Sequence, residues 1–481
     1  MLDEESYLDI AQQIASHPLR PYDWFRPWQP WGATPPADAF LFAHPPLHLW
    51  WVALWQRLGV GPALRLAVGL PWALLLGWAT GELAATCVQR PGRAALVWVT
   101  GPAVALGLAS SLMIDLPVVA LSTIAVTLWV TARPGLAGLA LALAAFTKYP
   151  ALVLLPVLGV DAWRGGRGRD FGRLLAVFAA LWGAGEAWLA WSYGEPHLLR
   201  VLRTAGDIGR GPLAGRTLGA LTRLGLVLAP VWALGTGRRG LVAGVAGAAL
   251  TGGLLAGQLA PSELALTALL GGCGAAVLAC GLMEDRPRHA TLLRLWVAAG
   301  LAAVVLGHNY VGGRYLLPVA APLALLLTPR LAGLSRARFG AMVALSAALA
   351  LGVVRAEGAH ARLQVAVADA LNDEAAALGR PPGVFTGEWT FRWRMTALGW
   401  RFASPEERPP AGTLYAAPLH ASPGPLPPGL VPLAEVVERG PGPLRLLDLE
   451  RGVGYHAETL GPAPLGVGPS IAERGRLFEV R

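Results

Sequence analysis

Charged residues are scarce in this chain of 481 residues, where Asp, Glu, Lys and Arg together make up 14%, against about 25% in a typical soluble protein. Hydrophobic residues make up 54%, and the mean hydropathy is +0.49. One or two soluble cores cannot bury that much apolar surface. The shortage of charge therefore excludes an ordinary soluble protein, and long apolar runs between short arginine-bearing breaks predict a polytopic membrane protein.

Lysine and cysteine are also rare. Lys148 is the single lysine, so 38 of the 39 basic residues are arginine. The three cysteines, Cys87, Cys273 and Cys280, all lie in apolar segments, which argues against a disulfide framework, a metal site and redox chemistry. The net charge of +9 does not indicate nucleic acid as a partner, because the arginines stand in short loops between apolar runs. That is the positive-inside pattern of cytoplasmic loops.

Hydropathy divides the chain into three parts. Residues 1–61 are polar and aromatic and predict a first extracytoplasmic loop with interfacial helices. Residues 62–355 form the predicted transmembrane domain, whose apolar segments lie at 62–88, 94–112, 116–132, 136–147, 149–162, 172–193, 217–235, 240–258, 262–283, 290–307, 315–329 and 339–355. Residues 356–481 predict a small soluble α/β domain, with helices at 360–378 and 389–399 and strands at 383–386, 413–416 and 444–449. The expected fold is all-α with about twelve spans, followed by this extracytoplasmic domain.

The breaks between the apolar segments alternate in character. Arginines mark one set, which comprises Arg90 and Arg93, Arg133, Arg164 to Arg173, Arg238 and Arg239, Arg286 and Arg288, and Arg330 to Arg338. The other set comprises 1–61, 110–115, 194–216, 258–262, 308–314 and everything after 356. Since basic loops stay in the cytoplasm, we expect the first set inside and the second set outside the bacterial plasma (inner) membrane.

Residues 136–162 allow two topologies. A single tilted span is one, because roughly 20 residues cross the hydrocarbon layer. A short or re-entrant hairpin is preferred, because arginines flank both ends and Pro150 disfavours helix at the residue before it. The hairpin puts Lys148 at its outer tip and leaves every basic loop on one side.

The first loop opens on the carboxylates Asp3, Glu4 and Glu5, at the start of a predicted helix that runs to about Ala15. Residues 47–58 repeat Leu and Trp at helical spacing and predict a helix in the membrane interface, where indole rings favour the headgroup level. The carboxylates either place a base among lipid headgroups or merely complement the helix dipole.

The order of five short motifs resembles the GT-C membrane glycosyltransferases, in particular the bacterial members akin to the family 39 protein O-mannosyltransferases and the lipid A aminoarabinose transferase. The motifs are Asp3-Glu4-x-x-Tyr7, His44-Pro45-Pro46-Leu47, Ile114-Asp115-Leu116-Pro117, Phe146-Thr147-Lys148-Tyr149 and Gly313-Arg314-Tyr315-Leu316-Leu317-Pro318. They run from residue 3 to residue 318. Family members place a span before the Asp-Glu motif. Because Met1 stands two residues before Asp3, we expect either a misassigned start or a truncated chain.

The resemblance implies an inverting glycosyltransferase that moves a sugar from a polyprenyl-phosphate carrier to an extracytoplasmic lipid, glycan or protein. Asp3 would take the proton of the acceptor hydroxyl, and Glu4 would position Asp3 or the acceptor. Lys148 and Arg314, with Tyr315, would bind the donor phosphate. Alternatively, Lys148 and Arg314 could each serve only as an interfacial anchor whose side chain reaches toward the lipid headgroups.

Further residues carry weaker expectations. Asp115 either caps a helix or shares Mg²⁺ or Mn²⁺ with Asp3, and no metal is required. Arg200 and Arg203 lie in the loop 194–216, which either covers the donor phosphate as a lid or contacts solvent and anionic headgroups. Candidate substrate-binding residues are Tyr7, His44 and His308, although a single histidine is more often an ordinary loop residue. The aromatic stretch 387–393 either stacks on an acceptor glycan or packs as a helix face.

Two rival functions remain. A transporter or lipid flippase without catalysis would show paired halves, and no internal repeat is evident. It also gives no reason for acidic groups at the outer face. A glycan polymerase or ligase would use a pyrophosphate-linked donor instead.

Overall fold

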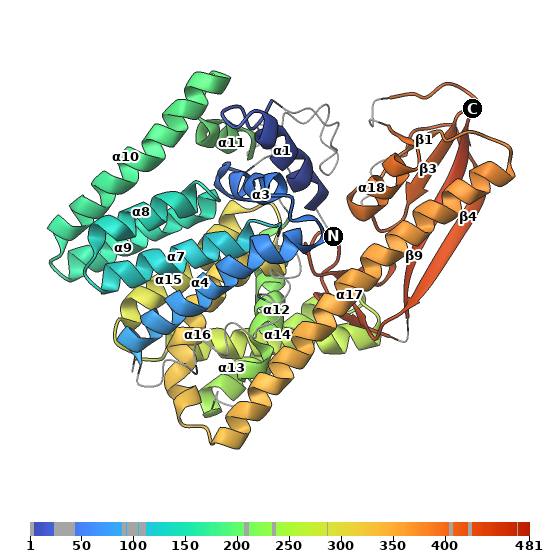
Figure 1. The fold of residues 1–481 in the computed structure, drawn as a ribbon. Coiled ribbons are helices and arrows are strands. Elements are labelled where there is room, and N and C mark those ends of the chain that lie inside the picture. Colours follow the sequence, from blue (N-terminus) through green and yellow to red (C-terminus); the bar gives the residue numbers. More distant parts are fainter. Residues whose placement is uncertain are drawn as a thin grey trace.

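The structure is a computed structural model that describes residues 4–23, 44–88, 93, 104, 112–205, 211–232, 237–285, 287–403, 407–421, 426–468 and 470–481. A helical body is joined to a C-terminal sheet domain through one long helix, α17 (Figure 1). The α-helices of the body are α1 (Glu4–Ser16), α3 (Leu47–Arg57), α4 (Leu64–Cys87), α7 (Asp115–Val130), α8 (Pro134–Ala145), α9 (Leu154–Arg164), α10 (Gly168–Tyr193), α11 (His197–Ala205), α12 (Leu213–Trp232), α13 (Gly237–Leu255), α14 (Pro261–Leu282), α15 (Ala290–Ala302), α16 (Leu317–Ala332) and α17 (Arg336–Ala377). Short helical turns are η1 (Gly61–Ala63), η2 (Tyr149–Val153), the π-turn η3 (Ala303–Gly307) and η4 (Gly313–Leu316).

The helices bear the marks of an integral membrane protein. Among the described residues, six helical segments are long and apolar enough to cross a bilayer, and α7 and α8 are shorter apolar helices. Large apolar side chains also cover outward faces, namely Leu66, Leu70, Leu74 and Trp78 on α4 and Leu241, Val242, Val245 and Leu250 on α13. A soluble monomer rarely exposes such patches. The predicted count of twelve spans is not confirmed, and the predicted segment 94–112 lies almost wholly outside the described residues.

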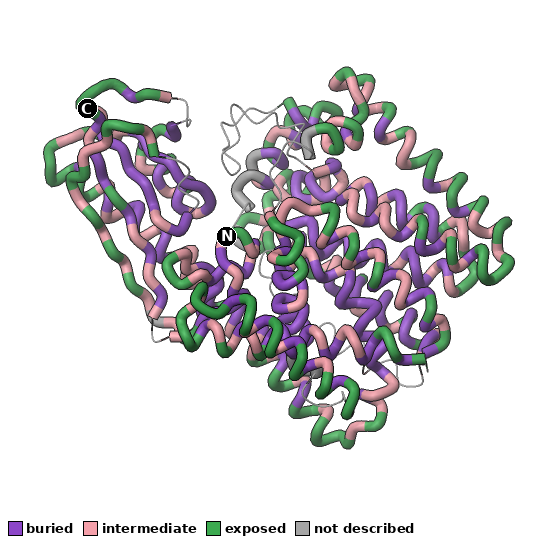
Figure 2. The backbone as a smooth tube through the Cα atoms, turned by 180° about the vertical axis from the view of Figure 1, so that it is seen from behind, coloured by how far each residue is buried: buried purple, intermediate pink, exposed green. Residues whose placement is uncertain are grey.

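Buried residues concentrate where helices face one another and where α17 meets the sheet, as Figure 2 shows. The largest core cluster joins α4, α7, α8, α9, α15 and α16. A smaller cluster joins α1 and α3 to residues 112–114, directly before α7. The two predicted helices of the first loop are therefore present, and they pack onto the segment that leads into Asp115.

The predicted hairpin over 136–162 is present as two helices, α8 and α9, joined through η2. Lys148 has extended backbone angles at the turn between them, and Pro150 lies at the start of η2. Helix α10 packs tightly against this turn. Its Gly185 lies so close to the Phe146 ring of the turn that an added Cβ would come within 2.5 Å of the ring. In Figure 1 the arginine-bearing turns α7–α8 and α9–α10 lie at the end of the body away from the sheet.

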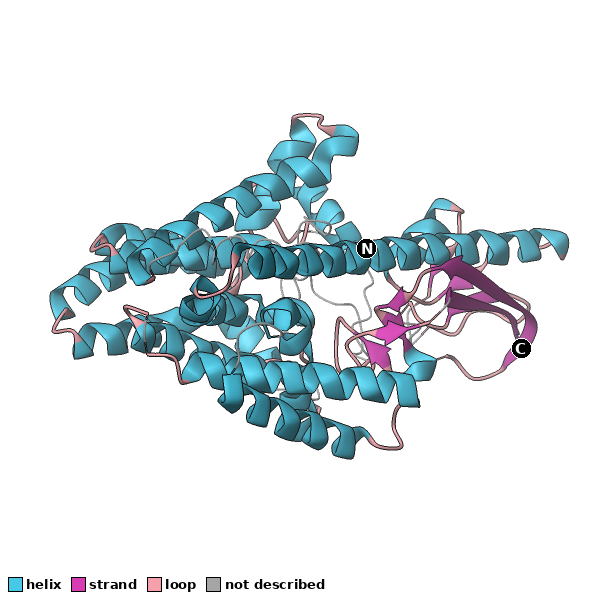
Figure 3. Cartoon of the chain, turned by 90° about the horizontal axis from the view of Figure 1, so that it is seen from below, coloured by secondary structure: helices cyan, strands magenta, loops and turns pink. Residues whose placement is uncertain are grey.

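Helix α17 has 42 residues, a length of about 60 Å at 1.5 Å per residue. Its first half carries the apolar segment 339–355, and its second half extends along the sheet (Figure 3). The helix continues through residue 356, so the predicted start of the soluble domain falls inside a helix rather than in a linker. Because the helix is continuous, the apolar segment 339–355 is joined rigidly to the part of α17 that packs on the sheet.

The C-terminal domain is a five-stranded sheet with strand order β2-β1-β3-β9-β4, packed on α17 and the short helix α18 (Trp389–Ala397). Its strands are β1 (Val384–Phe385), β2 (Arg401–Phe402), β3 (Leu414–Pro418), β4 (Leu430–Pro441) and β9 (Ser470–Val480). Shorter pieces are β5 (Leu444–Arg445), β6 (Leu447–Asp448), η5 (Leu449–Arg451), β7 (Val453–Gly454) and β8 (Gly466–Val467). The predicted α/β character is confirmed, including α18 and the strands near 384, 414 and 444. The long antiparallel pair β4–β9 was not predicted.

Candidate functional site

A buried ion pair lies near the end of α7 that faces the first-loop helices. Lys148 Nζ donates a hydrogen bond to Asp115 Oδ1 at 2.6 Å, and both side chains are 7% exposed. Arg314 Nε lies 4.0 Å from the other oxygen, Asp115 Oδ2. Asp115 opens α7, Lys148 lies in the α8–η2 turn and Arg314 lies in η4. Two cations thus contact one carboxylate.

Aromatic rings support the two cations. Lys148 Nζ lies 4.6 Å and Arg314 Cζ 5.2 Å from the centroid of the Tyr315 ring, within cation–π range. The His308 ring stacks on Tyr315 with centroids 4.5 Å apart, and the Tyr315 hydroxyl donates to the Tyr310 hydroxyl at 2.8 Å. These contacts fix the positions of the cations before any ligand is bound.

Two histidines near the cluster do not add to its charge. Burial and the nearby Lys148 ammonium lower the pKa of His308 to about 4 and the pKa of His44 well below its usual range. The ring of His44 lies parallel to Tyr7 with centroids 6.5 Å apart, and its carbonyl accepts from the Tyr22 hydroxyl at 2.8 Å. Both imidazoles are therefore neutral groups that can share hydrogen bonds with a sugar.

The cluster forms the polar end of a pocket of about 540 Å³. Asp115, Lys148, His308, Arg314 and Tyr315 line that end. The remaining walls are mostly apolar and include Val118, Val119, Val153, Leu154, Trp296, Ala303, Val304 and Pro318. A pocket with cations at one end and apolar walls elsewhere suits an amphipathic anion.

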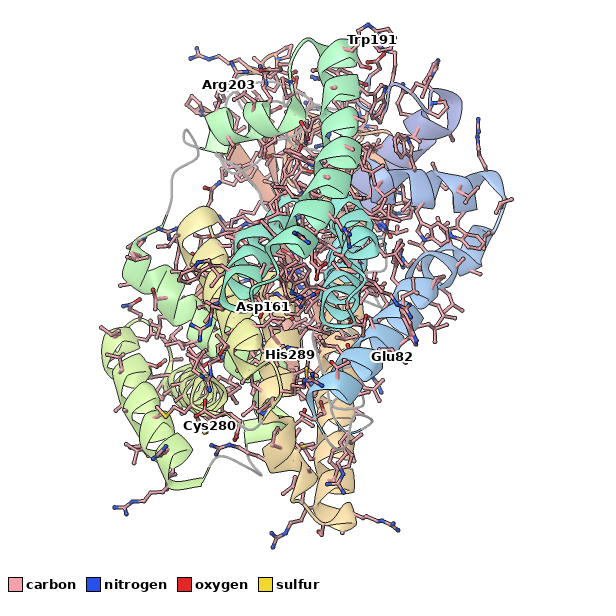
Figure 4. All side chains as sticks on the ribbon, turned by 90° about the vertical axis from the view of Figure 1, so that its left-hand side faces the viewer. Glu82, Asp161, Trp191, Arg203, Cys280 and His289 are labelled. Carbon is pink, nitrogen blue, oxygen red and sulfur yellow. The ribbon has the colours of Figure 1, made fainter. Side chains whose placement is uncertain are left out.

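The structure brings together most of the predicted site residues, but not all. Asp3 lies outside the described residues, and Glu4 is the first residue of α1. Arg200 and Arg203 do not line the pocket, because both pair with Glu195. Figure 4 shows Arg203 on α11 at the end of the molecule that also bears Trp191.

A second polar group holds the Lys148 turn and was not predicted. The Tyr149 hydroxyl donates to Glu186 Oε1 at 2.7 Å and lies 2.6 Å from His197 Nδ1. The other oxygen, Glu186 Oε2, accepts from the backbone N–H of Leu198 at 3.0 Å. Glu186 could have been identified from the sequence, because it is a carboxylate within the apolar segment 172–193. Acidic residues are rare in membrane spans and usually functional.

A loop of the C-terminal domain supports the segment that carries Arg314. The Gly313 N–H donates to the Tyr455 carbonyl at 3.2 Å, and the Glu458 N–H donates to the Val311 carbonyl at 3.1 Å. Fully buried Arg223 of α12 donates to the same Tyr455 carbonyl at 3.2 Å. We call residues 454–461 the bracing loop. No sequence motif indicated it, because its contacts are made largely through backbone atoms.

The metal site predicted for Asp115 and Asp3 includes a residue outside the described ones, so it remains a prediction. Nowhere in the described ranges do three or more His, Cys, Asp or Glu side chains come together in a possible metal site. Asp115 already shares its two oxygens with Lys148 and Arg314, and a further cation would be repelled by both.

No protein-family model matches the chain, and no curated protein matches it. Among solved structures, the chain is similar to ArnT from Cupriavidus metallidurans in two states. The apo crystal structure is 16% identical with a TM-score of 0.39, over 82% of this chain and 79% of that chain. The structure bound to undecaprenyl phosphate is 15% identical with a TM-score of 0.40, over 85% of this chain and 82% of that chain.

ArnT is the lipid A aminoarabinose transferase, one of the two relatives that the motif order resembles.

Proposed function

We propose that the protein is a membrane glycosyltransferase whose donor is a sugar linked to polyprenyl phosphate. The observation that carries this proposal is the pocket with Lys148 and Arg314 at one end and apolar walls elsewhere. A polyprenyl-phosphate sugar has the same division, with an anionic headgroup on an isoprenoid chain. Its phosphodiester carries one negative charge, which the Lys148 ammonium and the Arg314 guanidinium can bind.

In the proposed reaction, the acceptor hydroxyl oxygen attacks the anomeric carbon while the bond from that carbon to the phosphate oxygen breaks. Asp3, assigned by its place in the motif order, takes the hydroxyl proton, and Glu4 positions Asp3 or the acceptor. The polyprenyl phosphate leaves with the electron pair and gains a second negative charge. Lys148 and Arg314 stabilise that charge as it develops. A single displacement inverts the anomeric centre.

The same proposal assigns the neighbouring groups. Tyr7, His44 and His308 would contact the sugar, and Tyr315 would hold the cations over the phosphate. We propose that the two cations, rather than Mg²⁺ or Mn²⁺ shared between Asp115 and Asp3, neutralise the leaving phosphate. The acceptor, a lipid, glycan or protein, would approach from the extracytoplasmic side of a bacterial plasma membrane.

Binding of undecaprenyl phosphate to the protein in nanodiscs tests the donor site. Lys148→Met removes one charge-assisted contact and should weaken binding about ten- to a hundredfold. Lys148→Arg keeps the charge with a different shape and should lose less. Arg238→Met removes an equal charge from an exposed position at the start of α13 and serves as the control.

Lys148→Met also leaves Asp115 buried without its closest partner, which is destabilising. The double variant Lys148→Met with Asp115→Asn also removes the buried carboxylate, and because it still lacks the Lys148 ammonium it should bind more weakly than the wild type. Wild-type affinity in either variant would reduce Lys148 to an anchor and overturn the proposal. A wild type that moves the lipid between leaflets without transferring sugar would instead be a flippase.

A further inference from the structure

A second pocket lies between α17 and the C-terminal domain, apart from the donor site. Its space, counted together with the part open to solvent, is about 290 Å³. Its lining residues are Glu357, His360, Ala361 and Gln364 of α17, Trp389 and Thr390 of α18, and Leu446, Leu447 and His456. The donor site uses none of these side chains.

Gln364 indicates that the pocket receives a ligand. The residue is 2% exposed, and its side chain lines the pocket. Its amide offers a donor and an acceptor at the pocket wall, and native proteins usually satisfy such groups. A ligand with hydroxyl groups would supply both a donor and an acceptor for this amide.

Trp389 is the second unusual residue of the pocket. Its backbone has φ of +64°, a left-handed conformation that a bulky residue rarely adopts. Strain of this kind persists where the surrounding structure enforces it, and it clusters at binding sites. The aromatic stretch 387–393 thus serves two purposes. Phe391 and Arg392 are buried inside the domain, whereas Trp389 and Thr390 line the pocket.

The charge of the pocket selects the class of ligand. Glu357 Oε2 lies 3.0 Å from His456 Nε2, and His360 Nε2 lies 3.6 Å from the buried carboxylate of Glu473. Among the described residues, no arginine or lysine lines this pocket, whereas Lys148 and Arg314 line the donor site. A phosphate would meet carboxylates here, so the fitting ligand is an uncharged sugar. Its hydroxyls can bond Glu357 and Gln364, and its C–H face can pack on an indole.

Backbone contacts of the bracing loop link a wall of this pocket to the segment that carries Arg314. His456 lines the pocket, and the carbonyl of the preceding Tyr455 accepts the N–H of Gly313, next to Arg314. A Cβ added to Gly312 would come within 2.4 Å of the His456 carbonyl oxygen, so the two segments are in tight contact. We propose that this pocket binds one sugar residue of a glycan acceptor while another part of the acceptor reaches the donor. This inference rests on the proposed glycosyltransferase function.

Saturation-transfer NMR on the full chain in nanodiscs tests the inference, with the methyl glycosides of glucose, galactose, mannose and N-acetylglucosamine as probes. At least one glycoside should bind the wild type. Gln364→Met keeps the length of the side chain but removes its hydrogen bonds, and should weaken that binding about tenfold. Gln258→Met makes the same change at an exposed position at the end of α13 and should have no effect.

The inference is overturned if no glycoside binds, or if Gln364→Met binds it as the wild type does. Undecaprenyl phosphate binding, measured on the same samples, separates the two proposals. Lipid binding without glycoside binding would refute the acceptor pocket and leave the donor site standing. Glycoside binding that depends on Gln364 without lipid binding would support the pocket and refute the donor proposal.

Discussion

At the scale of single residues, Lys148 shows how one costly side chain defines a site. A lysine at the centre of a membrane costs about 2.5–3.5 kcal/mol on insertion scales. An anchor would offset that cost by reaching toward the headgroups, but Lys148 is 7% exposed and donates to a buried carboxylate. Arg314 and Tyr315 lie beside this pair, so two cations converge on one carboxylate at the polar end of the pocket. This geometry favours the phosphate clamp over the anchor.

Asp3 is the residue whose replacement tests the chemistry itself. Asp3→Asn keeps the size of the side chain but cannot accept a proton at working pH. We expect turnover to fall about 10²–10⁴-fold while affinity for undecaprenyl phosphate stays near that of the wild type. Sugar-transfer kinetics and lipid binding, measured together, give the two quantities.

Glu5→Gln is the control for Asp3, because it removes a neighbouring carboxylate that lies outside the motif. Glu5→Gln should lower turnover only slightly. Near-normal turnover by Asp3→Asn would refute Asp3 as the base, and Glu4 or Asp115 would become the next candidate.

At the scale of elements, the site depends on how short segments between helices are held. Residues 308–316 carry three side chains of the donor pocket and contain only the short turn η4. The bracing loop and Arg223 supply the hydrogen bonds that hold this segment. Positioning therefore comes from another domain, which links donor binding to the placement of the C-terminal sheet.

Gly312→Ala tests this positioning. The added methyl group would come within 2.4 Å of the His456 carbonyl oxygen, so the segment bearing Arg314 must move. A displacement of about 1 Å at a binding group is enough to weaken function strongly, and we expect undecaprenyl phosphate affinity to fall about tenfold or more. Gly253→Ala in α13 meets nothing within 4 Å and should leave affinity unchanged. Equal affinities in the two variants would show that the bracing loop does not position Arg314.

At the scale of the whole molecule, the arginine-bearing turns and the sheet domain lie at different ends. The turns α7–α8 and α9–α10 are far from the sheet, and α17 leads from Arg336 to the sheet (Figure 1). If basic turns stay in the cytoplasm, the sheet domain is extracytoplasmic. The donor pocket would then open on the side from which the acceptor arrives.

Cysteine labelling in intact cells tests this arrangement. Glu374→Cys, at the exposed end of α17, should react with a membrane-impermeant maleimide added outside. Arg169→Cys and Arg238→Cys should react only after permeabilisation. The three native cysteines are buried and should give little background. Labelling of Arg238→Cys in intact cells would contradict the topology.

Local physical rules acting on the sequence were enough for much of this protein. Apolar runs predicted most helices of the body, because a segment in lipid must form its backbone hydrogen bonds within itself, as a helix does. Pro150 and the flanking arginines determined the hairpin that holds Lys148, and alternation determined several strands of the C-terminal domain. Motif order also selected Asp115, Lys148, Arg314 and Tyr315, and the structure brings these four into one pocket with His308, a candidate from the preceding loop.

Only the tertiary structure decided how these residues are paired. Asp115 bonds Lys148 across two helices, and Glu186 holds the Lys148 turn through Tyr149. The pairing of β4 with β9, the unbroken length of α17 and the bracing loop were equally invisible in the sequence. Each depends on backbone contacts or packing between segments far apart in the chain, and no local pattern of hydropathy or charge encodes which distant segment will lie alongside.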